Sequence, residues 1–288
     1  MRRASYRLTV GEAALVVLVG VFLLLLIVPA GLHARGYGRQ VVCLGNVQML
    51  GRAWLAYAAD NDDRIVNGHV PRDAGYANTS LWLGRGYSDN AWWVDPPHNE
   101  HGVYTGDPIP CRLEDERLGI ESGRLFPYVG IAAAYHCPED KGYLNSGMNR
   151  AGKRSYSITG LMNGEDNWGR PGRVNVRKAG DIRSPGAKCV FVEYTDWRGW
   201  NMGSWVMWSE TSWVDPFAIW HGDRSTLGFA DGHAESHAWV DPSTLRMATG
   251  LAPNPINWAA GEGTDFLYMQ RAYVPAQDLE QVSGNPTH

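Results

Sequence analysis

The chain contains few lysines and no long run of basic residues. Lys and Arg together number 26 against 30 Asp and Glu, which gives a formal net charge of -4 at pH 7 and an isoelectric point near 6.1. Proteins that bind nucleic acid draw much of their affinity from basic side chains that neutralise phosphates. The composition therefore argues against nucleic acid as a partner.

Common catalytic motifs are also missing from the sequence. Gly-x-Ser-x-Gly, Ser-x-x-Lys and His-Glu-x-x-His do not occur. The aspartates at positions 60, 62 and 63 lack the spacing of a calcium-binding loop and its terminal Glu. These absences favour a protein that is not an enzyme.

Cysteine is sparse, with four residues in 288, while Gly (34), Pro (16) and Trp (13) are plentiful. This balance is typical of one loop-rich domain that contains β-structure. Cys43 and Cys189 fall at positions that favour buried thiols, so Cys111 and Cys137 are the candidate disulfide pair.

Residues 13–32 contain no charged side chain, and about 20 such residues suffice for a helix to cross a membrane. Arg2, Arg3 and Arg7 precede this segment, which predicts a cytoplasmic N-terminus and a translocated main domain. A signal peptide cleaved after Ala30 is the alternative interpretation. The expected organisation is a basic N-terminus (1–12), a transmembrane helix (13–32), an extracytoplasmic domain (33–275) and a flexible tail (276–288), held in the inner membrane by a single pass.

Beyond the apolar segment, hydrophobic residues recur every three or four positions, which predicts an amphipathic helix. The stripe consists of Cys43, Val47, Leu50, Trp54 and Tyr57, and it ends at the polar cluster of residues 60–63. Residues 64–118 are expected to be rich in loops, and a short helix is expected over residues 122–129.

Strands are predicted where β-branched and aromatic residues gather, at residues 155–159, 188–194 and 204–208. A hairpin is predicted over residues 226–240. Its arms meet at Asp231 and Gly232, a pair suited to a two-residue type I′ turn in which both residues have positive φ.

Several motifs in order resemble those of bacterial prepilin-type proteins related to the pseudopilins of type II secretion. They follow the N-terminal apolar segment and comprise residues 43–51 (CLGNVQMLG), 57–62 (YAADND), 125–129 (LFPYV), 135–140 (YHCPED) and 154–157 (RSYS). His221, followed after nine residues by Asp231 and Gly232, matches the His-x9-Asp-Gly signature of the prepilin processing-associated subfamily.

The resemblance implies a pilin-like α+β fold, in which a long N-terminal helix spans the membrane and packs on an antiparallel β-sheet with long, loop-rich insertions. It also implies a role in filament or secretion-apparatus assembly, with the lipid bilayer and other pilin-like or secretion-system subunits as partners.

The chain departs from the family at the processing site. Family members carry Gly-Phe-Thr-Leu-Ile-Glu, are cleaved after the Gly, and use the Glu to pair with the amino terminus of a neighbour. Here Gly11 is followed by Glu12, and Val16 occupies the position of that Glu. We therefore expect no cleavage at Gly11 and no role as a major filament subunit.

A row of polar residues on the second arm of the hairpin is a candidate site for a divalent metal. His233, Glu235 and His237 alternate and so share one face of the sheet, where Glu193 or His221 could join them. The alternative is an ordinary solvent-facing polar surface. Asp231 is accounted for by the turn itself.

Tryptophans are concentrated near residue 200, at Trp197, Trp200, Trp205, Trp208 and Trp213. Exposed aromatic faces bind sugars well, although most Trp side chains lie in cores. The leading interpretation is a non-enzymatic, membrane-anchored, pseudopilin-like structural or assembly protein of a type II secretion or type IV pilus-related system. The alternative is an anchored envelope module that binds polysaccharide through these tryptophans. A metal-dependent hydrolase built on His221, Asp231 and the row that starts at His233 is third.

Overall fold

The structure is a computed structural model that describes most of the chain. The described residues are 9–70, 91–105, 111–141, 154–164, 175–194, 204–208, 212–215, 218–248, 259–260 and 263–276. Residues 1–8 of the predicted basic N-terminus and nearly all of the predicted tail lie outside them.

Helix α1 (Val10–Asp60) is 51 residues long and dominates the architecture. It begins at a capping box in which the Thr9 N–H donates to Glu12 Oε2 at 2.8 Å and the Glu12 N–H donates to Thr9 Oγ1 at 3.3 Å. It ends at Asn61, and Asp62 and Asp63 follow with positive φ. The predicted end of the amphipathic helix at this polar cluster is confirmed.

The prediction of a membrane-spanning helix is wrong and is corrected here. Among the residues that the structure describes, no helix combines the length and the apolar character needed to cross a membrane. The location of the main domain is a separate question and stays a prediction.

A four-stranded antiparallel sheet forms the centre of the body, in the order β1-β2-β5-β6. Its strands are β1 (Tyr156–Ile158), β2 (Cys189–Glu193), β5 (Arg224–Phe229) and β6 (Ala234–Ala238). These positions confirm the strands predicted at 155–159 and 188–194 and both arms of the hairpin. The segment at 204–208 contributes only β3 (Met207–Trp208), which pairs with β4 (Ser212–Trp213) in a second sheet completed by β7 (Ala259–Ala260).

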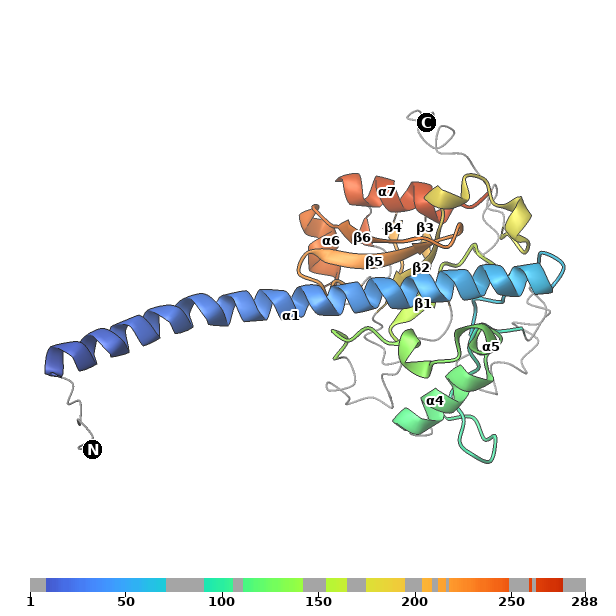
Figure 1. The fold of residues 1–288 in the computed structure, drawn as a ribbon. Helices are drawn as coiled ribbons and strands as arrows, with labels where there is room; N and C mark the ends of the chain where they lie inside the picture. The colour runs from blue at the N-terminus through green and yellow to red at the C-terminus, as the bar shows by residue number, and fades with distance from the viewer. Residues whose placement is uncertain are drawn as a thin grey trace.

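The two faces of the four-stranded sheet are covered by different helices. On one face, α1 lies across β5, where Val47 packs so closely over Gly228 that a Cβ there would come within 2.6 Å of Val47 Cγ1. On the other face, Leu227 and Phe229 share a core with Phe266 of α7 (Gly263–Tyr273). Figure 1 shows the sheet between these two helices, with the N-terminal half of α1 projecting away from the body.

The remaining helices include one that the sequence analysis expected to be loop. Helix α4 (Leu113–Ser122) starts inside that segment, where Asp115 accepts the backbone N–H and the guanidinium of Arg112. Helix α5 (Phe126–Val129) lies within the short helix predicted at 122–129. The other short elements are α6 (Pro242–Ala248) and the 3-10 segments η1 (Ala132–Tyr135), η3 (Ala179–Asp181) and η4 (Pro185–Ala187).

The turn of the hairpin differs from the predicted type I′ turn. The Gly232 N–H donates to the Phe229 carbonyl at 2.9 Å, which places Ala230 and Asp231 at the centre of the turn. Gly232 alone of these residues has positive φ (87°) and follows the turn, and the Phe229 N–H donates to the His233 carbonyl at 2.9 Å. This is the pattern of a turn followed by a left-handed glycine, the second common hairpin connection.

Replacing Gly232 tests this turn directly. In Gly232→Val, a β-branched residue would be forced to positive φ, and its Cβ would lie 3.0 Å from Leu55 Cδ1. We expect the free energy of unfolding to fall by about 1–3 kcal/mol, measured by denaturant unfolding.

The matched control is Gly45→Ala, at a glycine of α1 around which a Cβ would meet nothing within 4 Å. Its stability should stay equal or rise slightly, because alanine favours the helix. Equal stability of wild type and Gly232→Val would show that the turn is assigned wrongly.

Candidate metal centre

Cys43 faces inward from the buried stripe of α1. The stripe residues Cys43, Val47, Leu50 and Trp54 are completely buried, as their three- and four-residue spacing predicts. The Cys43 sulfur lies 2.7 Å from Glu193 Oε1 and 3.1 Å from the Tyr156 hydroxyl. The helix therefore brings a thiol to the end of strand β2, 150 positions away in the chain.

Cys137 approaches the same point from the loop after η1. The carbonyl of Cys137 accepts the Asp140 N–H at 2.9 Å, which closes a turn around Pro138. Asn46 of α1 fixes this loop, because its Nδ2 donates to the His136 carbonyl at 3.0 Å. Cys137 is completely buried as a result.

Glu193 and His221 complete the cluster from the sheet. Glu193 is the last residue of β2 and is completely buried. His221 lies just before β5, at a turn in which its N–H donates to the Arg224 carbonyl at 3.3 Å and Gly222 has a φ of 77°. The side chain of His221 is only 2% exposed, and its Nε2 lies 3.0 Å from Glu193 Oε1.

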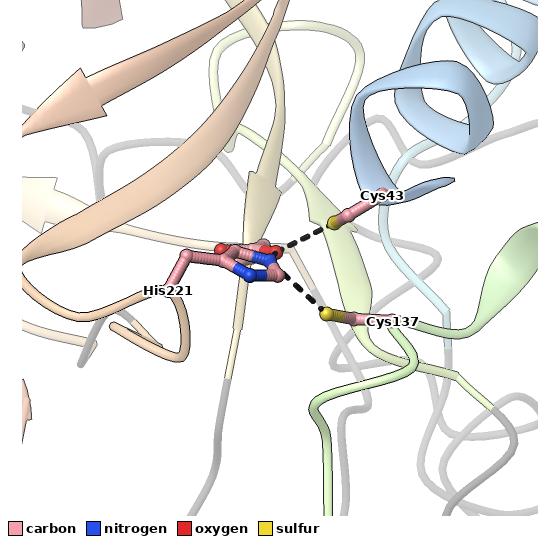
Figure 2. Close-up of side chains that lie close together, drawn as sticks. Cys43, Cys137 and His221 are labelled. Carbon is pink, nitrogen blue, oxygen red and sulfur yellow. Dashed lines mark hydrogen bonds and ion pairs between the residues drawn. The ribbon is translucent and has the colours of Figure 1, made fainter. Parts of the chain in front are cut away.

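The four side chains form a compact group that we call the Cys-Glu-His cluster: Cys43, Cys137, Glu193 and His221. One ligand atom from each lies within 4.8 Å of the ligand atoms of all the others. The Cys137 sulfur is 3.4 Å from His221 Nε2. Figure 2 shows Cys43 and Cys137 approaching His221 from two different parts of the chain.

Burial and mutual contact shift the pKa values of the cluster. Burial raises the pKa of the Cys43 thiol well above its usual range, and the hydrogen bond with Cys137 and the charge of Glu193 add to the rise. For His221, burial lowers the pKa, but hydrogen bonds with Cys43 and Glu193 and the Glu193 charge outweigh it and raise the pKa to about 10. In the metal-free cluster, the thiol of Cys43 is therefore protonated and the imidazole is cationic at neutral pH.

The structure brings together only two of the six predicted metal-site residues. Glu193 and His221 meet in the cluster, whereas the row on β6 lies elsewhere. Glu235 accepts a hydrogen bond from the Tyr268 hydroxyl of α7, and the ring of His237 stacks on Tyr268 with centroids 3.8 Å apart. Helix α7 thus covers the face of the sheet on which the sequence predicts a metal site or a solvent-facing surface.

The other two predicted residues sit at the hairpin turn. His233 pairs with Asp231 there, with Nδ1 2.5 Å from Oδ1 and both side chains about 40% exposed. His221 and the Asp231-Gly232 turn lie at opposite ends of β5 (Arg224–Phe229). The fixed spacing of the His-x9-Asp-Gly motif therefore reflects the length of β5 and its two flanking turns.

The tryptophans of the predicted platform whose side chains the structure describes do not form an exposed surface. Trp205 is fully buried and Trp213 is 1% exposed, and both belong to the core on the α7 side of the sheet. Trp197 and Trp200 lie outside the described residues, as does the side chain of Trp208. Burial of Trp205 and Trp213 weakens the case for a polysaccharide-binding surface.

Sequence reasoning missed both cysteines of the cluster. Cys43 on an apolar stripe and Cys137 before a proline each look like ordinary buried thiols. The one available signal was that the stripe, the Cys137-Pro138 pair and His221 all occur within the motifs that resemble prepilin-type proteins.

Comparison of the chain with protein-family models, with curated proteins and with solved structures found no match. The prepilin-type assignment therefore rests on the motifs alone and stays a prediction.

All four cysteines are free thiols in the structure, including the candidate pair Cys111 and Cys137. Cys137 contacts His221, whereas the Cys111 sulfur lies 3.6 Å from the Arg112 carbonyl. Alkylation of the denatured, metal-stripped chain without reductant should therefore modify four thiols, counted by intact mass. Two modified thiols, with Cys111 and Cys137 protected, would establish the disulfide instead.

Proposed function

We propose that this protein is a non-enzymatic, pseudopilin-like structural subunit, in which the projecting part of α1 packs against the same part of other copies. The observation that supports this is the contrast between the two halves of one helix. From Cys43 onward α1 is docked on the sheet, and towards the N-terminus its described apolar side chains are exposed.

The exposed side chains lie on every side of the helix. Leu15, Val16, Val17 and Leu18 follow one another in sequence, so they point in four directions about 100° apart, and each is at least 60% exposed. Removing apolar surface from water stabilises a protein by about 25 cal/mol per Å², so covering these side chains is favourable. A helix that is apolar all round is normally surrounded on all sides, which a bundle of several such helices provides.

The start of α1 favours packing without the charge pairing of processed pilins. Val16 is apolar where the family has a glutamate that pairs with the new amino terminus of a processed neighbour. With Val16, the helices can pack without a processed amino terminus, because no buried carboxylate needs that partner. Glu12 forms the capping box with Thr9. The hydrogen bond from the Thr9 backbone N–H is the main cause that lowers the pKa of the Glu12 carboxyl, and the Thr9 hydroxyl adds to it. Cleavage after Gly11 would remove this cap and the first residues of the helix.

Cysteine cross-linking tests the bundle. In a Cys111→Ser background, Val17→Cys (Val17 64% exposed) should give a discrete disulfide-linked dimer on oxidation in mild detergent, because neighbouring helices hold this position close. The matched control is Val103→Cys, an apolar position on the body that is 51% exposed and should stay uncross-linked. Leu18→Glu added to Val17→Cys should abolish the dimer.

Equal cross-linking at positions 17 and 103 would reflect random collision and would contradict the proposal. A chain that stays monomeric in sedimentation but floats with phospholipid vesicles would contradict it as well, and would identify lipid as the cover of α1.

Intact-mass measurement of the cellular protein tests the processing prediction separately. Because Thr9 and Glu12 form the cap of α1, we expect a chain in which Gly11 and Glu12 are still joined. A mass that begins at Glu12 would show that the chain is processed despite Val16.

A further inference from the structure

The Cys-Glu-His cluster has the composition and shape of a metal site. We propose that Cys43, Cys137, Glu193 and His221 bind one zinc ion in a closed, structural site that joins α1 to the sheet. This inference does not depend on the proposed function, because the cluster lies inside the body and not on the projecting part of α1.

The distances suit tetrahedral zinc. Bonds of ~2.3 Å to sulfur and ~2.0–2.2 Å to nitrogen and oxygen place tetrahedral ligand atoms about 3.4–3.8 Å apart. The contacts in the cluster are 2.7 Å for Cys43 to Glu193, 3.0 Å for His221 to Glu193 and 3.4 Å for Cys137 to His221. An ion at the centre therefore requires these three pairs to open by less than about 1 Å, while the other pairs, which are at most 4.8 Å apart, close by a similar amount.

The donor set selects the kind of ion. Two thiolates and an imidazole are ligands of zinc and other borderline or soft metals, whereas calcium and magnesium take oxygen ligands almost exclusively. With four protein ligands, each with a buried side chain, no coordination position is left for water. Such a site holds structure together and does not activate a substrate.

The surrounding contacts are those that orient metal ligands. The second oxygen of Glu193, Oε2, accepts the Thr226 N–H at 3.0 Å, which leaves Oε1 directed at the cluster. The Tyr156 hydroxyl, 3.1 Å from the Cys43 sulfur, can donate to a thiolate there. Outer-shell partners of this type fix ligand geometry and raise metal affinity.

Without a metal, the cluster has close contacts that its hydrogen atoms cannot all satisfy. His221 Nε2 carries at most one hydrogen, yet it contacts both Glu193 Oε1 and the Cys137 sulfur. Oε1 also accepts from Cys43. When zinc binds, the two thiols and the cationic imidazole each release one proton to solvent, so all four ligand atoms direct a lone pair at the ion.

Metal analysis of the full chain tests the proposal. The detergent-solubilised protein, purified or refolded with zinc sulfate and then dialysed, should contain one zinc per chain. Replacement of zinc by cobalt should give the thiolate-to-cobalt charge-transfer band and the visible absorption of a tetrahedral site. A wild-type chain that is folded, by circular dichroism, but binds neither metal after refolding would overturn the proposal.

Substitutions assign the ligands. Cys137→Ser and His221→Ala should lose the stoichiometric metal, whereas the matched control Cys111→Ser should keep it. Tyr156→Phe should keep one zinc per chain but bind it about 10–100-fold more weakly in competition with a chromophoric chelator. Retention of tetrahedral cobalt absorption in Cys137→Ser would show that the ion sits elsewhere.

A variant that fails to fold would also lose metal, so His221→Cys serves as the rescue. It supplies a third thiolate at the same position and should restore both metal binding and the charge-transfer band. Added zinc should raise the melting temperature of the metal-free wild type and of His221→Cys, but not of Cys137→Ser. An equal rise in all three would indicate non-specific binding and contradict the proposal.

Discussion

The docking of α1 on the central sheet is the contact on which the rest of the structure depends. Val47 fits against Gly228, where a larger residue would be excluded, and Leu50 and Trp54 extend the same buried stripe. Full burial of each such aliphatic side chain contributes about 1.5–3 kcal/mol. Because a helix is stiff over this length, fixing its C-terminal half also fixes the direction in which its N-terminal half leaves the body.

Periodicity made part of this fold predictable. The stripe on α1 and the strands β1, β2 and β5 each repeat a local pattern that burial enforces, so they could be predicted from neighbouring residues alone. Helix α4 could not, because it depends on the Arg112–Asp115 contact at its start more than on an apolar stripe. Helix α7 does carry a stripe, with Phe266, Met269 and Tyr273 buried, so the sequence contains a local signal for it.

The site was predictable only in part, for a related reason. Alternation along β6 correctly put Glu235 and His237 on one face of the sheet, but it carries no information about Tyr268, which α7 brings over that face. The actual cluster joins residues that are 150 and 84 positions apart in its closest thiol contacts. Contacts between residues so far apart depend on how whole helices and strands pack, so no local sequence pattern predicts them.

The Cys-Glu-His cluster fixes the position of α1 along the sheet, which the apolar stripe of α1 alone does not do. Hydrophobic residues recur every three or four positions, so a shift of α1 by one turn, about 5.4 Å, would still place apolar side chains on the sheet. The same shift would carry Cys43 and Asn46 away from Glu193 and the His136 carbonyl, and would leave a completely buried carboxylate with fewer partners. A hydrogen bond to a buried charged group contributes about 1.5–3 kcal/mol, so its loss disfavours the shifted register. The polar contacts at the centre of the body therefore decide where along the sheet α1 docks, and with it how far the apolar half of the helix extends.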